Sequence, residues 1–310
     1  MPTAELDILQ STSFRAMAST WTVSLDRSDG RNRMLVDQVV AAVRAVERAC
    51  SRFDPSAELA RWNRSVEPFV ASDLLVEVLD AAMWGFASTD GRFDPRVHDA
   101  LCALGYDRTF AAVRERTAIP PSVALPESFP HPVIGRGARL LAPQEFPLDL
   151  GGIAKGYALA MAGELLSAHG VLGVVNAGGD VVVIGDAVPM PIGIEDPHRE
   201  GELVAVLHCE GGAIMTSSIR VRSWTAAGMP VHHLIDPRTG RPGGTGLSAV
   251  TVVGAQPVDC EVWSKALFLN GADGITAEAE DRGLAVLWVT SSGRVCWSSA
   301  LVPSLSWVAT

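Results

Sequence analysis

The sequence predicts an α+β fold in one large domain of residues 1–310. Two observations predict it. First, 48% of the 310 residues are hydrophobic, and a chain of this length and composition buries a large core, as one domain or as two closely packed lobes. Second, patterns typical of hairpins are mixed with patterns typical of helices, without the regular strand–helix alternation of a doubly wound parallel sheet.

The N-terminal part of the chain predicts a strand followed by helices. Phe14–Leu25 alternates between apolar and polar residues as a strand does, and Arg33–Cys50 has apolar residues at helical spacing. The turn Asp54-Pro55-Ser56 follows, with Ser56 as a possible N-cap of a short helix that ends at Asn63. Asp73–Ser88 is a longer apolar helix.

The middle of the chain contains its least regular segment. Residues 114–144 are rich in Pro, Gly and Arg without clear periodicity, which predicts a surface excursion with short strands. A short strand, Phe146–Leu150, then runs through Gly151-Gly152 into a helix that starts near Ile153. The elements expected after it are strands at 171–176, 180–184, 203–209, 213–216 and 247–253, a helix over Val258–Asn270, and a terminal hairpin of Leu284–Thr290 with Arg294–Ser298.

The charge balance excludes several classes of partner. The chain has 25 basic and 35 acidic residues, a net charge of −10, so it has no positive field to attract nucleic acid or anionic lipid. A phosphate-bearing ligand would have to be held by local groups. No uncharged apolar run approaches the roughly 18 residues that a membrane helix needs, so we expect no membrane span.

The cysteines indicate a reducing compartment. There are five, they are far apart, and none forms a C-x-x-C pair, so a disulfide framework or a zinc ribbon is not expected. The N-terminal residues also lack a basic region followed by an apolar run. We therefore expect a cytoplasmic protein.

A glycine-rich segment, Asp149-Leu-Gly-Gly-Ile-Ala-Lys-Gly-Tyr157, has the features of an anion site. Two glycines let the backbone approach a ligand, the helix after them offers free N–H groups, and Lys155 adds a positive charge. An ordinary glycine helix start with a solvated lysine is the alternative. The spacing is neither that of a Walker A motif nor G-x-G-x-x-G.

Two further segments carry polar groups. Asn176-Ala-Gly-Gly-Asp180 lies between two strands, either as a tight hairpin whose turn Asp180 satisfies or as a place where glycines make room for a planar ligand. His233–Gly240 combines the imidazole of His233 with Asp236, whose backbone the following proline restricts. An imidazole with a carboxylate partner is what activation of a hydroxyl requires, although many His–Asp pairs are structural.

Taken together, the segments resemble the flavinyl transferase family of the ApbE type, whose members are FAD:protein FMN transferases. The resemblance implies an ApbE-like, T-fold-like arrangement of mixed sheets with the flavin site between two packed lobes. The segments that carry it follow one another over most of the chain: Phe14–Thr20, Ser51–Asn63, Gly91–Pro95, Asp149–Tyr157, Asn176–Asp180, Thr216–Ser218, His233–Gly240 and Glu261–Phe268.

The resemblance implies a reaction in which the FAD diphosphate is cleaved with the help of Mg²⁺. FMN then passes to a Ser or Thr of an acceptor flavoprotein, and AMP is released. His233 and Asp236 are the implied catalytic residues: His233 would activate the acceptor hydroxyl or orient the diphosphate, and Asp236 would fix the loop. The implied FAD contacts are Met17, Phe53, Arg92, Phe93, Asp94, Asp149, Lys155, Gly178, Gly179, Thr216, Ser217 and His233. For Met17, Phe53 and Phe93, packing in the core is the alternative.

The metal site departs from the family pattern. The family's last motif resembles D-A-x-x-T-A-L-F, and here the run is Glu261-Val-Trp-Ser-Lys-Ala-Leu-Phe268. The implied ligands are Gly152, Glu261 and Ser264, with Lys265 where the family has Thr. An ammonium cannot ligate a cation and repels one nearby. Lys265 must therefore turn away, lose its proton, or take over part of the metal's role; Asp259 is a possible replacement ligand.

Other functions stay open at this stage. Water in place of the acceptor hydroxyl would make the protein an FAD diphosphatase, and a lysine in the metal position would suit an FAD-binding protein with little turnover. Two smaller departures, Ala18-Ser19 and Ser218, add bulk where the family usually has glycine near the flavin. An unrelated α+β domain would require all the matched segments to be coincidental.

Overall fold

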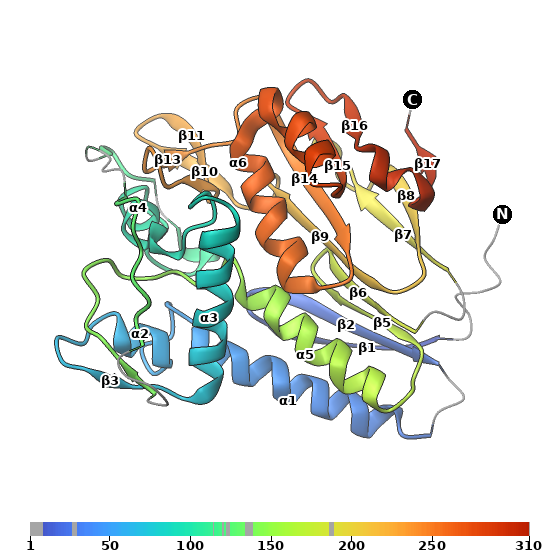
Figure 1. The fold of residues 1–310 in the computed structure, drawn as a ribbon, viewed down its shortest axis with the longest axis horizontal. Coiled ribbons are helices and arrows are strands. Elements are labelled where there is room, and N and C mark those ends of the chain that lie inside the picture. The colour runs from blue at the N-terminus through green and yellow to red at the C-terminus, as the bar shows by residue number, and fades with distance from the viewer. Residues whose placement is uncertain are drawn as a thin grey trace.

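An eight-stranded antiparallel sheet runs through the protein in the order β1-β2-β5-β6-β9-β14-β15-β16 (Figure 1). The computed structural model describes residues 9–26, 30–113, 115–119, 121, 125–133, 139–185 and 189–309. The strands of this sheet are β1 (Leu9–Ala16), β2 (Ser19–Asp26), β5 (Gly173–Ala177), β6 (Asp180–Ile184), β9 (Gly212–Ser218), β14 (Leu247–Gly254), β15 (Ala285–Thr290) and β16 (Val295–Trp297).

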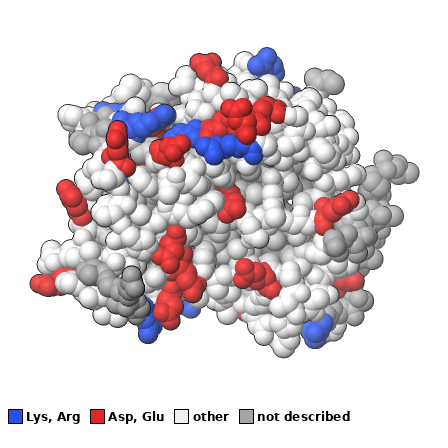
Figure 2. Space-filling model, in the orientation of Figure 1, with Lys and Arg blue, Asp and Glu red and all other residues white. Residues whose placement is uncertain are grey.

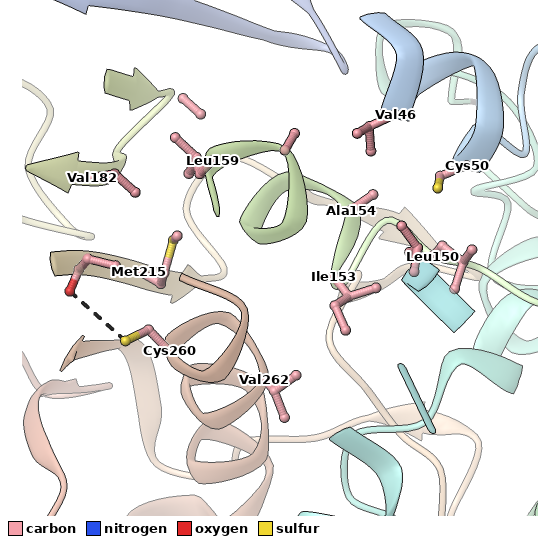
Figure 3. Close-up of a cluster of buried hydrophobic side chains, with 14 of the residues drawn as sticks. Val46, Cys50, Leu150, Ile153, Ala154, Leu159, Val182, Met215, Cys260 and Val262 are labelled. Atoms are coloured by element: carbon pink, nitrogen blue, oxygen red, sulfur yellow. Dashed lines mark hydrogen bonds between the residues drawn. The ribbon is translucent and has the colours of Figure 1, made fainter. Parts of the chain in front are cut away.

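Helices cover one face of the sheet. They are α1 (Asn32–Cys50), α3 (Asp73–Ser88), α5 (Ala154–Ala168) and α6 (Pro257–Asp281), and α1, α5 and α6 lie in front of the strands in Figure 1. Figure 3 shows how their apolar faces meet the sheet: Val46 of α1, Leu159 of α5 and Val262 of α6 come together with Val182 of β6 and Met215 of β9. These side chains form the main hydrophobic core, the dominant stabilising contribution.

A second, three-stranded sheet covers the opposite face. It is formed by β17 (Leu305–Val308), β8 (Leu203–Cys209) and β7 (Met190–Glu195), in that order. Val181 and Val183 of β6 pack toward it, whereas Val182 packs toward the helices. Because β6 is covered on both faces, all of its residues are apolar after Asp180, and all are buried.

A third apolar cluster holds together what we call the small lobe: Leu101, Leu104, Tyr106, Ala226, Val231 and Ile235. It joins α4 (His98–Ala103) to β10 (Ser223–Ala226), β11 (Met229–His232) and β12 (Ile235–Asp236). These elements lie at the left of Figure 1. The other short elements are α2 (Glu58–Trp62), β3 (Phe69–Val70), β4 (Leu140–Leu141), β13 (Arg241–Pro242) and the 3₁₀ helices Pro95–Val97, Phe110–Ala112 and Ser299–Ser304.

The α+β fold and most of the predicted elements are confirmed. The helix α3 has the predicted bounds and is capped by Ser72, whose hydroxyl accepts a hydrogen bond from the Leu75 amide at 3.2 Å. The helix α6 extends the prediction, which ended at Asn270, because the chain bends at Gly271 with a φ of 75° and then continues to Asp281.

The prediction of a single strand over Phe14–Leu25 is wrong. The segment belongs to a hairpin in which β1 and β2 pair and Ala16 lies opposite Ser19. The turn residues Met17 and Ala18 have φ angles of 51° and 56°, as a two-residue turn with the twist of the flanking strands requires. Neither is Gly, Asn or Asp, so the usual turn signal is missing from the sequence.

Three local predictions need correction. Ser56 is not the N-cap of α2, since Ala57 holds that position and the Ser56 hydroxyl donates to Asp54 at 2.7 Å. Residues 146–150 form no strand, because the Asn63 side chain bonds both the N–H and the C=O of Leu148, at 3.0 and 2.8 Å. The hairpin of β15 and β16 is not terminal, as β17 follows it.

The segment 114–144 was predicted as a surface excursion with short strands. Within its described residues, Leu140–Leu141 forms β4 and pairs with β3, and Arg116 bridges Ala226 of the small lobe. Residues 114, 120, 122–124 and 134–138 lie outside the described part of the chain. No helix of the described chain is both long and apolar enough to cross a membrane.

Gly244 is expected to tolerate no side chain. Its φ is +75°, and an added Cβ would lie 1.9 Å from the Phe268 ring. Gly201 has a similar φ of +80° but nothing within 4 Å, so it serves as the control. We expect Gly244→Ala to lower the free energy of unfolding by about 1–3 kcal/mol more than Gly201→Ala in urea titrations. Equal losses would contradict this packing.

Candidate active site

A cavity of about 1150 Å³ opens between the large sheet and the small lobe. It exceeds the roughly 300–1,000 Å³ of pockets for drug-sized ligands, so a dinucleotide has room in it. It collects residues from distant parts of the sequence. The predicted site residues that line it are Met17, Phe53, Arg92, Phe93, Asp94, Asp149, Gly152, Lys155, Gly178, Gly179, Thr216, Ser217, His233 and Glu261.

Two hairpin turns form one edge of the cavity. The β1–β2 turn carries Met17, whose amide donates to Glu47 at 2.5 Å. The β5–β6 turn carries Gly178 and Gly179, with φ angles of 69° and 105°. The Gly179 amide donates to the Asn176 side chain at 2.9 Å. The glycines therefore close a tight hairpin and leave the cavity edge free of side chains, and room for a planar ligand at this edge stays a prediction.

An aromatic pair and an arginine form another wall. The Phe53 and Tyr106 rings lie 5.5 Å apart, and the Arg52 guanidinium carbon lies 4.0 and 4.8 Å from their centroids. Arg52 also donates to the Asp149 carboxylate at 2.6 Å and to the Tyr106 carbonyl at 2.8 Å. Sequence reasoning missed Arg52 as a site residue, although it directly precedes Phe53.

Three of the predicted FAD contacts have side chains that contact other parts of the protein: Arg92, Phe93 and Asp94. Arg92 forms an ion pair with Glu278. Phe93 is packed in the main core and only 5% exposed, which fits the alternative of core packing for this residue. The Asp94 carboxylate accepts three side-chain hydrogen bonds from Arg96, the shortest at 2.7 Å.

Lys155 and Asp180 form an ion pair at the cavity. The other Asp180 oxygen accepts a hydrogen bond from the Thr216 amide at 2.9 Å, so this carboxylate joins α5, β6 and β9. Asp180 does not satisfy its own turn, as one alternative proposed, because Asn176 does so. Sequence reasoning thus missed Asp180 as the partner that fixes Lys155.

A second ion pair lies beside the first. One Glu261 oxygen accepts a hydrogen bond from the Gly156 amide in the first turn of α5 at 2.5 Å, and the other lies 3.2 Å from the Lys265 ammonium. The ammonium also lies 3.3 Å from the Glu261 carbonyl. Burial raises the pKa of Glu261, and the charge of Lys265 acts in the opposite direction. Burial lowers the pKa of Lys265, and the charge of Glu261 again acts in the opposite direction.

The predicted donor set does not fit Mg²⁺. Both Glu261 oxygens are in use, and the Lys265 stem lies against Gly152, where an added Cβ would be 3.3 Å from its Cε. The Ser264 hydroxyl does not line the cavity; it bonds the Ser217 hydroxyl at 2.8 Å. The described residues contain no cluster of His, Cys, Asp and Glu suited to a metal, and Asp259 does not line the cavity.

His233 lines the cavity, but Asp236 does not. The Asp236 carboxylate is bonded to Arg238 at 2.8 Å, so it fixes the loop rather than pairing with the imidazole. The Nδ1 atom of His233 lies 3.3 Å from the Arg222 carbonyl. Burial, with help from the Arg222 and Lys265 charges, lowers the pKa of His233 well below its ordinary value. The ring is therefore neutral near pH 7, and a proton on Nδ1 leaves the Nε2 lone pair free.

The charged groups relevant to an anion lie inside this cavity. On the face shown in Figure 2, acidic and basic side chains adjoin in one band, and most of the described surface is uncharged. The cavity is lined by groups of both signs, and its cations include Lys155, Lys265 and Arg222, the two lysines beside the carboxylates of Asp180 and Glu261. This arrangement provides the local positive groups that a phosphate-bearing ligand needs on an acidic protein.

Comparison with known proteins identifies relatives of the whole chain. The model of the ApbE family matches residues 17–288. A Klebsiella pneumoniae protein named FAD:protein FMN transferase is 25% identical over 293 residues, which cover 90% of this chain and 84% of that protein. A Rhodobacter capsulatus protein of the same name is 33% identical over 214 residues, covering 67% of this chain and 40% of that protein.

A solved structure has the same fold. The ApbE protein from Thermotoga maritima superposes with a TM-score of 0.83 at 24% identity, covering 96% of this chain and 100% of that one. The fold, with its antiparallel sheet and covering helices, is thereby confirmed as that of ApbE proteins.

The neutral His233 predicts a dependence of stability on pH. Its pKa is lowered from 6.5 in the folded protein, so the unfolded chain binds more protons below that pH and the folded state loses stability as the pH falls. Burial lowers the pKa of His232 to about 4, so this residue also makes the folded state less stable as the pH falls. As the pH falls from about 7 to 5, we expect the free energy of unfolding to decrease with a slope that approaches about 1.4 kcal/mol per pH unit for each histidine.

The measurement is urea denaturation across this pH range. His233→Gln should reduce the slope, whereas His208→Gln, at an exposed position of β8, should leave it unchanged. An unchanged slope in His233→Gln would contradict a neutral, half-buried imidazole.

Proposed function

This chain belongs to the ApbE family, and we propose that it transfers FMN from FAD to a Ser or Thr hydroxyl of an acceptor protein, with release of AMP. The observation that carries the proposal is a dinucleotide-sized cavity in which fixed cations and a neutral histidine meet. The names of the relatives support the same activity. We treat residues 1–310 as one functional unit, because the cavity takes residues from Met17 to Leu269.

FAD would lie along the cavity with its rings against apolar walls. Phe53 and Tyr106, held by Arg52, offer one aromatic surface, and Met17 offers a flexible apolar contact at the hairpin edge. Gly178 and Gly179 would let the backbone approach a ring closely. Asp149, fixed by Arg52, is placed to accept hydrogen bonds from polar groups of the ligand.

The diphosphate would lie against Lys155 and Lys265. Phosphoryl transfer depends more on positioning and charge neutralisation than on covalent participation of the protein. Both ammonium groups are held by buried carboxylates, so they need no reorganisation when the anion binds. Arg222 lines the same cavity and adds a further cation.

His233 would act as the base. The acceptor hydroxyl gives its proton to the Nε2 lone pair as its oxygen attacks the phosphorus of the FMN half. The bond from that phosphorus to the bridging oxygen breaks, and the bridging oxygen leaves with AMP. Thr216 and Ser217 border the same space and could orient the incoming hydroxyl. No divalent ion is part of this proposal, since the donor set does not fit Mg²⁺.

The cell compartment and the acceptor remain predictions of the sequence. All five cysteines are free thiols in the structure, as a reducing compartment would allow. We propose a cytoplasmic location and an acceptor flavoprotein with a Ser or Thr target, which the experiment below would identify.

The test is to incubate the purified protein with FAD and an extract of its source cells. We expect AMP release together with a flavin-fluorescent band on a denaturing gel, and mass spectrometry of the band should find FMN on a Ser or Thr. AMP without a band would indicate a diphosphatase, and bound FAD without either product would indicate a carrier.

The role of His233 is tested by His233→Asn. Because the base is lost and the cavity walls are kept, kcat should fall by about 10²–10⁴-fold with little change in the KM for FAD. His208→Gln, far along β8 and exposed, is the matched control and should retain full activity. A variant with unchanged kcat would exclude His233 as the base.

A further inference from the structure

A group of four buried or nearly buried charges lies at one wall of the cavity: Lys155, Asp180, Glu261 and Lys265. We propose that the ammonium of Lys265 neutralises the FAD diphosphate in place of a divalent cation, so that FAD binding and FMN transfer by this chain need no metal. The inference rests on the proposed function for its substrate, and it identifies Lys265 as the residue that sets the cation requirement.

The ammonium of Lys265 is fixed in position. Glu261 and Lys265 are one helical turn apart on α6, and the Glu261 carboxylate is anchored on the other side by the Gly156 amide of α5. The Lys265 nitrogen has two oxygen neighbours, the Glu261 carboxylate at 3.2 Å and the Glu261 carbonyl at 3.3 Å. A lysine held by two oxygens of one fixed residue acts as a preorganised point charge, as phosphate-binding lysines do.

The Lys265 charge is accessible from the cavity. The Lys265 side chain is 17% exposed, against 3% for Glu261, and it belongs to the lining of the cavity. Its stem lies against Gly152, in the turn before α5. Both residues line the cavity, and Lys265 is the more exposed of the two, so its ammonium is the more accessible charge of the pair.

The groups around Glu261 and Asp180 leave no free ligands for a divalent ion. A cation that reached Glu261 would have to displace the ammonium, and one beside it would be repelled across a poorly screened interior. Ser264, the nearest hydroxyl on the same helix turn, is bonded to Ser217 and to the Glu261 carbonyl. The Asp180 carboxylate is bonded to Lys155 and to the Thr216 amide.

The charge balance supports the same conclusion. The two carboxylates and the two ammonium groups sum to zero before a ligand binds. A diphosphate ester adds negative charge at the ammonium side of both pairs. His233 adds none, since its ring is neutral, and the Arg222 guanidinium nearby contributes a further positive charge.

The first experiment measures FAD affinity by titration calorimetry, with EDTA and with Mg²⁺. We expect wild-type affinities that agree within about twofold, because the cation is part of the chain. A rise of about tenfold or more on adding Mg²⁺ would overturn the inference. This comparison needs no variant, so a folding defect cannot obscure it.

Variants then assign the effect to Lys265. Lys265→Met should weaken FAD binding at least about tenfold while leaving riboflavin, which has no phosphate, bound as before. Arg282→Met is the matched control, because Arg282, directly after α6, forms the same kind of i,i+4 pair with Glu278 but does not line the cavity. Equal FAD affinity in Lys265→Met and wild type would overturn the inference.

The transfer assay separates this inference from the proposed function. FMN transfer in an extract dialysed against EDTA would support both. Transfer that appears only with Mg²⁺ would overturn the role of Lys265 and leave the FMN transferase intact. FAD binding that needs Lys265 but no metal, without any transfer, would support the role of Lys265 and overturn the proposed transferase activity.

Discussion

The Glu261 carboxylate is the group on which the cavity wall depends. It is buried, so it requires partners on both oxygens, and it finds them in the Gly156 amide of α5 and the Lys265 ammonium of α6. Only glycine fits at position 156, because an added Cβ would lie 2.6 Å from the carboxylate. The sequence predicted that the start of α5 would bind a phosphate. In the structure the Glu261 carboxylate binds there instead, and its other oxygen holds the Lys265 ammonium at the cavity.

Around this wall, the cavity is built from elements that leave its residues little freedom. Two hairpin turns with positive φ angles carry Met17, Gly178 and Gly179, and Arg52 ties the aromatic wall to Asp149. Both faces of the central sheet are packed, one by helices and one by the second sheet. Ligand contacts held by packed elements need less ordering when the ligand binds, which favours affinity.

A chain can belong to a family by its fold and still differ from that family in the chemistry of one site. This chain keeps the fold of ApbE proteins, and its cavity collects nearly all of the residues that the family resemblance implies. At one position of α6, however, it has a lysine that forms an ion pair where a metal ligand was expected. On our proposal, a single side chain changes the cation at a site while the surrounding fold is preserved, because function depends on the residues of the site.

Local patterns in the sequence were enough to predict the helices, most of the strands and the segments that border the cavity. Periodicity and capping depend on neighbouring residues, as the bounds of Asp73–Ser88 illustrate. Tertiary structure decided which charges far apart in the sequence meet. Arg52 reaches Asp149 across 97 positions and Lys155 reaches Asp180 across 25, while Asp236, three residues from His233, turns to Arg238 instead. Such pairs form because burying an unpaired charge is unfavourable, and only the packed fold determines which groups are buried together.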